Sequence, residues 1–329
     1  MGGVVRVRRA AFRWGWLSRV RLPRPVLVVG NRIVGGAGKT PTTLALLAHL
    51  RARGWQPGVL TRGYGAQRSG TAPTLMLDAA SAPGLTARET GDEPLLLWRR
   101  AQVPVAIDPD RARGGRTLLA HHPEIDILVC DDGLQHLRLQ RDIEVVVFDE
   151  RGQGNGWLLP AGPLREPIDV AAPPGLAAPP LVLYNAPRAS TPLPGYLGAA
   201  ELGTLQALAS WWQGEPTSDA PAPDASAARP FRALAGVAHP RRFFDALRRQ
   251  GWQIAELPLA DHQAFDTLPW PDDDADLIVT EKDAVKLEPA RLARERPLTR
   301  VWVAPLDFLP EPGFWLALDD ALQRCRRAA

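Results

Sequence analysis

Residues 33–40 read Ile-Val-Gly-Gly-Ala-Gly-Lys-Thr, and the closing Gly-Lys-Thr matches the end of the phosphate-loop pattern G-x-x-x-x-G-K-[ST]. In such a loop, backbone N–H groups of a tight glycine-rich turn surround the phosphates of a nucleotide. The lysine contacts the β- and γ-phosphate oxygens, and the threonine binds Mg²⁺. The pattern has glycine where Ile33 stands in this chain. A glycine-rich turn with an exposed lysine would also fit these residues, so the flanking sequence has to decide.

The flanks of residues 33–40 match the setting of a phosphate loop, which lies between a strand and a helix. Residues 25–31 form a short apolar run that predicts a buried strand, and residues 40–54 predict a helix that ends at Gly54. We therefore favour a working phosphate loop over an exposed turn. The predicted nucleotide-binding residues are Ile33, Val34, Gly35, Gly36, Ala37, Gly38, Lys39 and Thr40.

A pair of carboxylates follows a second apolar run. Residues 127–130 predict a strand, and Asp131, Asp132 and Gly133 come directly after it. An Asp-Gly turn explains these residues when they are considered alone. Beside a phosphate loop, however, carboxylates at a strand end can hold Mg²⁺, directly or through water. The combination therefore predicts that Asp131 and Asp132 serve the same nucleotide site, together with the hydroxyl of Thr40.

Two further residues could move a proton. Asp92 precedes the predicted helix 94–102, where a carboxylate commonly caps the helix, but near a γ-phosphate it could also accept a proton from an attacking hydroxyl. His262 lies in a predicted loop, where most histidines are structural or merely exposed. The spacing of the two residues does not show that they meet, because they fall in different predicted domains.

The elements that must position these residues alternate between apolar strands and helices. This alternation predicts an α/β fold with a mostly parallel sheet of the phosphate-loop NTPase type, covered by helices on both faces, with ligands at the carboxyl ends of the strands. The predicted strands are residues 25–31, 58–65, 74–77, 103–107, 125–130, 142–150 and 181–186, and the predicted helices are 40–54, 94–102 and 111–122.

The character of the sequence changes after Pro187. Residues 213–230 are rich in Ala, Pro, Ser and Asp without periodicity, which predicts a loop or linker. Residues 231–259, 274–287 and 299–308 predict a smaller second α/β unit. The predicted division is therefore a basic segment at 1–24, a phosphate-loop core at 25–188 and a C-terminal α/β domain at 189–329.

The first 25 residues carry seven arginines and no acidic residue, with Phe12, Trp14, Trp16 and Leu17 among them. Such a segment could lie on an anionic membrane surface, and it could equally be a solvated basic tail. It contains no apolar run long enough for a spanning helix. The formal net charge of the 329-residue chain is only +3, and no feature indicates binding to nucleic acid or to an obligate protein partner. Two cysteines, without a Cys-x-x-Cys, fit a reducing compartment and argue against a structural zinc site.

Eight short motifs occur in series between Val28 and Leu287: VVGN with VGGAGKTP, TRGYG, GDEP, DDGLQH, LPAGPLREP, GVAHPRRFF, DH and TEKDAVKL. In this series, the chain resembles the tetraacyldisaccharide 4'-kinases, the lipid A 4'-kinases of Gram-negative bacteria. The resemblance implies transfer of the γ-phosphate of ATP, with Mg²⁺, to the 4'-hydroxyl of a tetraacylated glucosamine disaccharide 1-phosphate, which forms lipid IVA. It also implies a peripheral enzyme on the cytoplasmic face of the inner membrane, with the acylated disaccharide and the membrane surface as its partners.

The resemblance assigns roles to residues at matching positions. Asp92 would be the catalytic base, and His262 would assist it. Asp131 and Asp132 would form the metal-binding pair, and Glu166 would be a further acidic residue near the metal and the nucleotide. The chain departs from the family at Ile33, where Ser or Thr is usual, and in its first residues, where many relatives carry a more apolar helix.

Two other interpretations stay open at this stage. A phosphate-loop protein with such an acidic strand end can be an ATPase switch that regulates a protein partner, although the second α/β unit and the absence of an Asn-Lys-x-Asp guanine signature argue against it. A soluble kinase for a polar small molecule is the third possibility. ATP turnover with and without an acylated disaccharide separates these alternatives.

Overall fold

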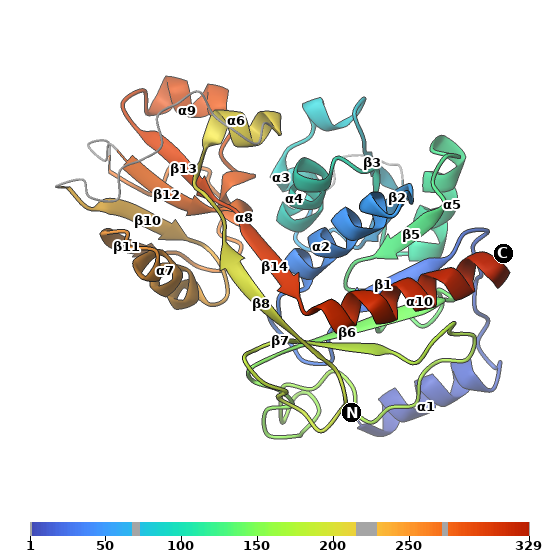
Figure 1. Cartoon of the computed structure of the whole chain (residues 1–329). Coiled ribbons are helices and arrows are strands. Elements are labelled where there is room, and N and C mark those ends of the chain that lie inside the picture. The colour runs from blue at the N-terminus through green and yellow to red at the C-terminus, as the bar shows by residue number, and fades with distance from the viewer. Residues whose placement is uncertain (1, 68–72, 215–228, 272–275, 329) are drawn as a thin grey trace.

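The computed structural model describes residues 2–67, 73–214, 229–271 and 276–328, and Figure 1 shows two sheets joined side by side. The larger sheet has the strand order β14-β8-β7-β6-β1-β5-β2-β4-β3, and the smaller one has the order β11-β10-β12-β13-β9. The strands of the larger sheet are β1 Val26–Gly30, β2 Pro57–Thr61, β3 Leu75–Leu77, β4 Val105–Ile107, β5 Ile127–Cys130, β6 Ile143–Asp149, β7 Leu181–Asn185, β8 Tyr196–Leu202 and β14 Leu306–Pro310. Those of the smaller sheet are β9 Gln206–Ala207, β10 Phe231–Ala235, β11 Ile254–Pro258, β12 Asp276–Thr280 and β13 Arg300–Ala304.

Helices cover both sheets. The helices are α1 Gly2–Arg13, α2 Lys39–Ala52, α3 Ala87–Thr90, α4 Asp92–Ala101, α5 Arg111–His121, α6 Leu208–Gln213, α7 Pro240–Arg249, α8 Glu281–Ala284, α9 Pro289–Glu295 and α10 Pro312–Ala328, with a short 3₁₀ turn at Ala82–Gly84. This arrangement confirms the predicted α/β class with a mostly parallel sheet. Within the described strands, antiparallel pairing occurs for β3, β9 and β14 at the sheet edges.

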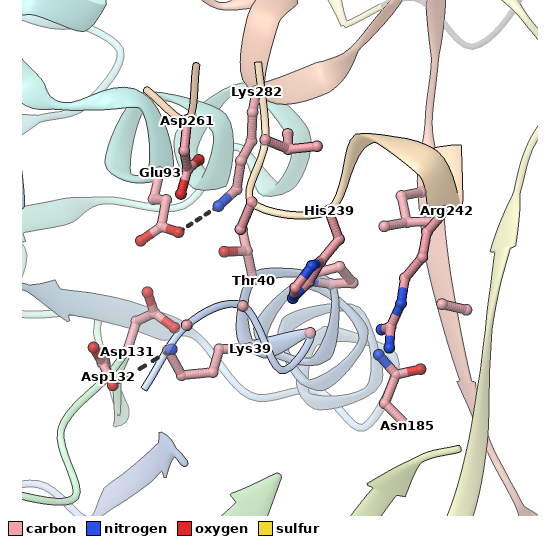
Figure 2. Close-up of a pocket in the computed structure, with 18 of the residues that line it drawn as sticks. Lys39, Thr40, Glu93, Asp131, Asp132, Asn185, His239, Arg242, Asp261 and Lys282 are labelled. Carbon is pink, nitrogen blue, oxygen red and sulfur yellow. Dashed lines mark hydrogen bonds and ion pairs between the residues drawn. The ribbon is translucent and has the colours of Figure 1, made fainter. Parts of the chain in front are cut away.

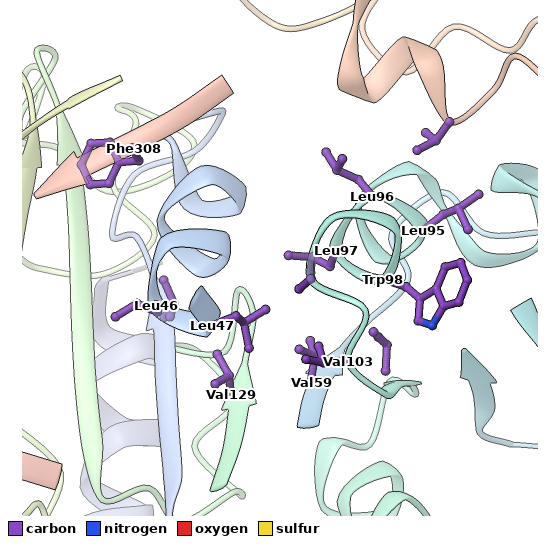
Figure 3. Close-up of a cluster of buried hydrophobic side chains, with 14 of the residues drawn as sticks. Leu46, Leu47, Val59, Leu95, Leu96, Leu97, Trp98, Val103, Val129 and Phe308 are labelled. Atoms are coloured by element: carbon purple, nitrogen blue, oxygen red, sulfur yellow. The ribbon is translucent and has the colours of Figure 1, made fainter. Parts of the chain in front are cut away.

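The central strands of the larger sheet are parallel and buried on both faces. β1 pairs with β5 on one side and with β6 on the other, and every residue of these three strands is buried. Both faces are covered by helices, so their apolar runs are continuous rather than alternating. On one face, Leu46 and Leu47 of α2 lie near Val129 of β5, and Leu95–Trp98 of α4 line the same cluster (Figure 3). The phosphate loop and the acidic strand end are thereby held on a rigid frame.

The division between the two units differs from the predicted boundary at residue 188. β8 and β14 belong to the larger sheet, and α10 packs against β7 of that sheet. The segment 299–308, which was predicted to lie wholly in the second unit, forms two strands on either side of Pro305: β13 in the smaller sheet and β14 in the larger one. The chain therefore crosses twice between the two units, from β8 to β9 and again from β13 to β14. At the second crossing, Pro305 has no N–H to continue the ladder of β13, and β14 pairs with the edge of β8. Most of the predicted linker 213–230 lies outside the described residues.

Candidate active site

The phosphate loop lies between the end of β1 and the start of α2, as predicted. Gly35 and Gly38 adopt positive φ angles of 89° and 86°, which glycine reaches without the strain that a side chain brings. α2 begins at Lys39, and the first N–H groups of a helix have no intrahelical acceptor. These groups and the positive end of the helix dipole favour a bound phosphate.

Ile33 and Val34 lie at the entrance of this loop and not in the cleft. The Ile33 side chain is fully buried, and its backbone forms a bridge with Leu164. The Val34 N–H donates a hydrogen bond to the carbonyl of Pro163 at 2.9 Å, so this donor is not available to a phosphate. The residue that departs from the phosphate-loop pattern is therefore part of the core. Phosphate binding by residues 33–40 stays a prediction, and the geometry favours the part from Gly35 onward.

Lys39 lies beside the two carboxylates that follow β5. Its Nζ is 3.8 Å from Oδ1 of Asp132 (Figure 2). Arg165 also pairs with Asp132, at 3.1 Å. Asp131 is buried and accepts a hydrogen bond of 2.8 Å from the hydroxyl of Thr43. Burial, followed by the charges of Glu93 and Asp132, raises the pKa of Asp131 to about 6. The structure thus brings Lys39, Asp131 and Asp132 together as the sequence predicted.

This group fits a divalent cation. In the described part of the chain, no three His, Cys, Asp or Glu side chains form a ready-made metal cluster. However, burial first and the nearby carboxylates of Glu93 and Asp132 second raise the pKa of Asp131, and a cation at this place would favour its charged form. Hard carboxylate and hydroxyl oxygens, such as those of Thr40, Asp131 and Asp132, are the ligands that Mg²⁺ prefers.

Glu166 is engaged by cations of the protein. It is buried, and its oxygens lie 2.5 Å from a guanidinium nitrogen of Arg9, 3.8 Å from Nε of Arg32 and 3.3 Å from the amide nitrogen of Gln135. The carboxylate therefore joins α1 to the larger sheet. A role for Glu166 near the metal and the nucleotide stays a prediction.

Asp92 and His262 meet across the two units. The Nδ1 atom of His262 lies 3.1 Å from Oδ2 of Asp92, and Nζ of Lys286 lies 3.3 Å from the same oxygen. Asp92 is the first residue of α4, and His262 follows β11 with a positive φ of 59°. The hydrogen bond to Asp92 is the largest influence on His262 and raises its pKa above the ordinary value. Helix capping was the simpler interpretation of Asp92, yet its carboxylate contacts residues of the second unit.

One cleft of about 1730 Å³ joins these groups. Pockets for a single small ligand usually measure about 300–1,000 Å³, so this one has room for a nucleotide and a second substrate. Residues from both units line it, and they include His262 and Glu93, whereas Asp92 is not among the described residues of its lining. Val5, Arg8, Leu158 and Leu159 also line it, so α1 borders the same cleft.

Several lining residues had no role in the sequence-based prediction. Lys282 of α8 reaches from the second unit to Glu93 of α4 at 2.6 Å (Figure 2). This ammonium group, as the largest influence, lowers the pKa of Glu93 to about 2. His239, Arg242 and Asn185 face the cleft beside the phosphate loop (Figure 2). Glu93 and Lys282 stand inside the motifs GDEP and TEKDAVKL, which were the signals available, but only the tertiary structure shows that they pair.

Comparisons with known proteins agree with one another. A family model described as "Tetraacyldisaccharide-1-P 4'-kinase" matches residues 1–323. Among similar curated proteins, the tetraacyldisaccharide 4'-kinase of Methylibium petroleiphilum is 56% identical over 321 residues, which cover 98% of this chain and 87% of that protein. The protein of the same name from Leptothrix cholodnii is 56% identical over 312 residues, which cover 94% and 86%. A crystal structure of LpxK from Aquifex aeolicus in complex with ATP has a TM-score of 0.77 at 24% identity, covering 98% of this chain and 95% of that one, and shows that the fold is shared.

Proposed function

The chain belongs to the tetraacyldisaccharide-1-P 4'-kinase family, and on that premise we propose that it transfers the γ-phosphate of ATP to the 4'-hydroxyl of a tetraacyldisaccharide 1-phosphate. The product is lipid IVA, an intermediate of lipid A biosynthesis. The observation that carries the proposal is the cleft itself, which is lined both by the phosphate loop with Lys39 and by His262, whose ring is hydrogen-bonded to Asp92. The alternative of an ATPase switch for a protein partner has no support from the family.

The geometry favours His262 as the group that receives the proton. The resemblance assigned this role to Asp92, but His262 lines the cleft, and Oδ2 of Asp92 is occupied by His262 and Lys286. With Nδ1–H donated to Asp92, the neutral imidazole has a free lone pair on Nε2. The substrate oxygen would attack the γ-phosphorus, the bond to the β-phosphate oxygen would break, and the hydroxyl proton would pass to Nε2. Asp92 would orient the ring and stabilise its charged form.

The phosphate end of the cleft would balance the charge of ATP. Lys39 would contact the β- and γ-phosphates, while backbone N–H groups from Gly35 onward would surround them. We propose that Mg²⁺ binds with the nucleotide at Thr40, Asp131 and Asp132, where it would neutralise phosphate charge. Lys282 and Arg242 would add positive charge from the second unit.

The proposed activity predicts that ATP turnover depends on the lipid. With detergent-dispersed tetraacyldisaccharide 1-phosphate, we expect ADP formation at least about a hundredfold faster than without it, because the hydroxyl must be positioned before transfer is efficient. The measurement is ADP release together with mass analysis of the phosphorylated lipid. The same disaccharide phosphate without acyl chains is the control. ATP turnover indifferent to the acylated disaccharide would contradict the proposal, and equal use of the unacylated sugar would favour a kinase for polar substrates.

We propose that the protein acts on the cytoplasmic face of the inner membrane and binds the membrane surface through α1. No helix in the described residues combines the length and apolarity that crossing a bilayer requires. Val4, Val7, Trp14 and Trp16 are exposed on or just after α1, next to arginines such as Arg6 and Arg13. Exposed aromatic rings with nearby arginines suit an anionic lipid surface. Because α1 borders the cleft, an acylated substrate could reach the phosphate loop from the bilayer.

Replacing both Trp14 and Trp16 with serine is expected to weaken binding to anionic vesicles about tenfold, because two rings that would enter the headgroup region are lost. Co-sedimentation with vesicles containing anionic phospholipid measures this effect. Leu298→Ser is the matched control, since Leu298 is exposed in the second unit and has no place in the proposed membrane contact. Unchanged vesicle binding by the double variant would rule out this surface as the membrane contact.

A further inference from the structure

Asp283 is a fully buried carboxylate that takes no part in the transfer described above. It belongs to α8 and accepts hydrogen bonds from the Gly236 N–H at 2.9 Å and the Thr280 hydroxyl at 2.7 Å. Its other oxygen lies 3.2 Å from Nζ of Lys286. A buried carboxylate without such partners would be strongly destabilising, so these contacts together compensate for the burial of Asp283.

Lys286 connects Asp283 to Asp92. Its ammonium group is 3.3 Å from Oδ2 of Asp92, and its side chain is only 6% exposed. The Nζ atom also lies 5.2 Å from the centre of the Phe265 ring, a cation–π distance. Lys286 is not among the described residues that line the cleft, so it is placed to act on Asp92 and not on a bound substrate.

Gly236 connects Asp283 to His262. Its N–H donates to Asp283, and its carbonyl accepts the backbone N–H of His262 at 3.3 Å. A Cβ at Gly236 would lie 2.7 Å from Oδ1 of Asp283, so only glycine allows this approach. His262 has a positive φ, which costs free energy and therefore has to be imposed by the surrounding contacts.

We infer that Asp283 and Lys286 are positioning residues that hold both members of the Asp92–His262 pair. The buried carboxylate of Asp283 fixes the position of His262 through Gly236 and that of Asp92 through Lys286. The inference rests on the proposed function, because it deepens the role of that pair. It also gives a reason for the spacing of Asp283 and Lys286 in TEKDAVKL, since residues three apart on a helical turn face the same way. A purely structural ion pair is the competing explanation.

Lys286→Met tests the inference. We expect kcat to fall about 10- to 100-fold, with KM for ATP within about twofold, because a displaced Asp92 no longer orients His262. The pH profile of kcat/KM supplies a second readout. His262 is surrounded by Asp92, Asp261, Lys282 and the Tyr64 ring. The positive charge of Lys286 offsets part of the negative charge of Asp92. Removing that positive charge should move the acidic limb of the profile to higher pH. A change in stability alone would not move it.

Two further variants test whether a loss of activity in Lys286→Met results from misfolding. Asp283→Asn with Lys286→Met removes both buried charges together, which proteins tolerate better than an unpaired charge. We expect this double variant to be no slower than the slower single variant, because the two residues act through one chain of contacts. Lys286→Arg should recover part of the lost kcat. Thermal unfolding of each variant confirms that the folded enzyme is being assayed.

Arg300→Met is the matched control, because Arg300 forms an ion pair of 2.7 Å with Asp276 in the same unit but away from the cleft. We expect its kcat and pH profile to match those of the unmodified enzyme. If Lys286→Met and the double variant also kept the original kcat and pH profile while His262→Ala was inactive, the inference would be overturned and the proposed function would stand. If His262→Ala itself kept full turnover, the proposed proton acceptor would fail, and the positioning role would fail with it.

Discussion

His262→Ala is expected to lower lipid-dependent turnover about a thousandfold while ATP affinity stays within about twofold. A positioned base contributes roughly 10²- to 10⁴-fold to a proton transfer, and alanine removes the Nε2 atom that would receive the proton. ATP affinity should persist because the phosphate loop and Lys39 lie in the other unit. Steady-state turnover and nucleotide titration measure the two quantities. His121→Ala is the control, since His121 is exposed at the end of α5 and is absent from the proposed site.

Asp92→Asn tests whether Asp92 orients the base His262 or is itself the base. The hydrogen bond to Asp92 raises the pKa of His262, so the neutral base becomes available only as the pH rises through that elevated value. Asparagine removes the negative charge, which should lower the pKa of His262 and move the acidic limb of kcat/KM to lower pH. The plateau should also fall, because the ring loses its orientation. If Asp92 itself were the base, Asp92→Asn would abolish turnover at every pH and His262→Ala would be milder.

Lys39→Met is expected to lower kcat about a thousandfold and to weaken ATP binding as well. Lys39 is the one lysine in residues 33–40. Without its ammonium group, the negative charge that develops on the transferred phosphoryl group would lose a positioned positive charge. Removing Lys39 also takes away a positive charge that lowers the pKa of Asp131. Turnover with the acylated disaccharide and titration with a non-hydrolysable ATP analogue measure the two effects.

Arg53→Met serves as the comparison for Lys39→Met. Arg53 follows the other end of α2 and pairs with Asp319 at 2.6 Å, and its side chain is 56% exposed. Exposed ion pairs contribute little to stability, so this variant should keep full activity. Full turnover by Lys39→Met would show that residues 33–40 are an ordinary glycine-rich turn.

The phosphate loop and the acidic strand end were predictable because their information is local. Residues 33–40 are contiguous, and the strand before them and the helix after them follow from nearby hydrophobic patterns. The parallel sheet was predictable for the same reason, since strands buried on both faces have continuous apolar runs. Once the sheet is formed, the carboxyl ends of β1 and β5 are neighbours, and Lys39 and Asp132 are brought close together.

Local patterns failed where the chain passes between the two units. The run 299–308 is mostly apolar, and nothing in its periodicity indicates that it changes sheets at Pro305. Likewise, Ile33 looked like a changed nucleotide contact, whereas the structure buries its side chain in the core. Burial at a given position depends on which distant segment packs against it, and for Ile33 that segment contains Leu164.

The sequence by itself determined the fold class, the place of the glycine-rich loop 33–40 between a strand and a helix and, through its series of motifs, the resemblance to one family of kinases. The tertiary structure alone decided that Asp92 and His262, 170 residues apart, form a hydrogen bond. It also decided that Lys286 contacts both Asp92 and Asp283. The physical reason is that spacing along a chain encodes periodic local structure, whereas contacts between two sheets arise from the packing of their whole surfaces.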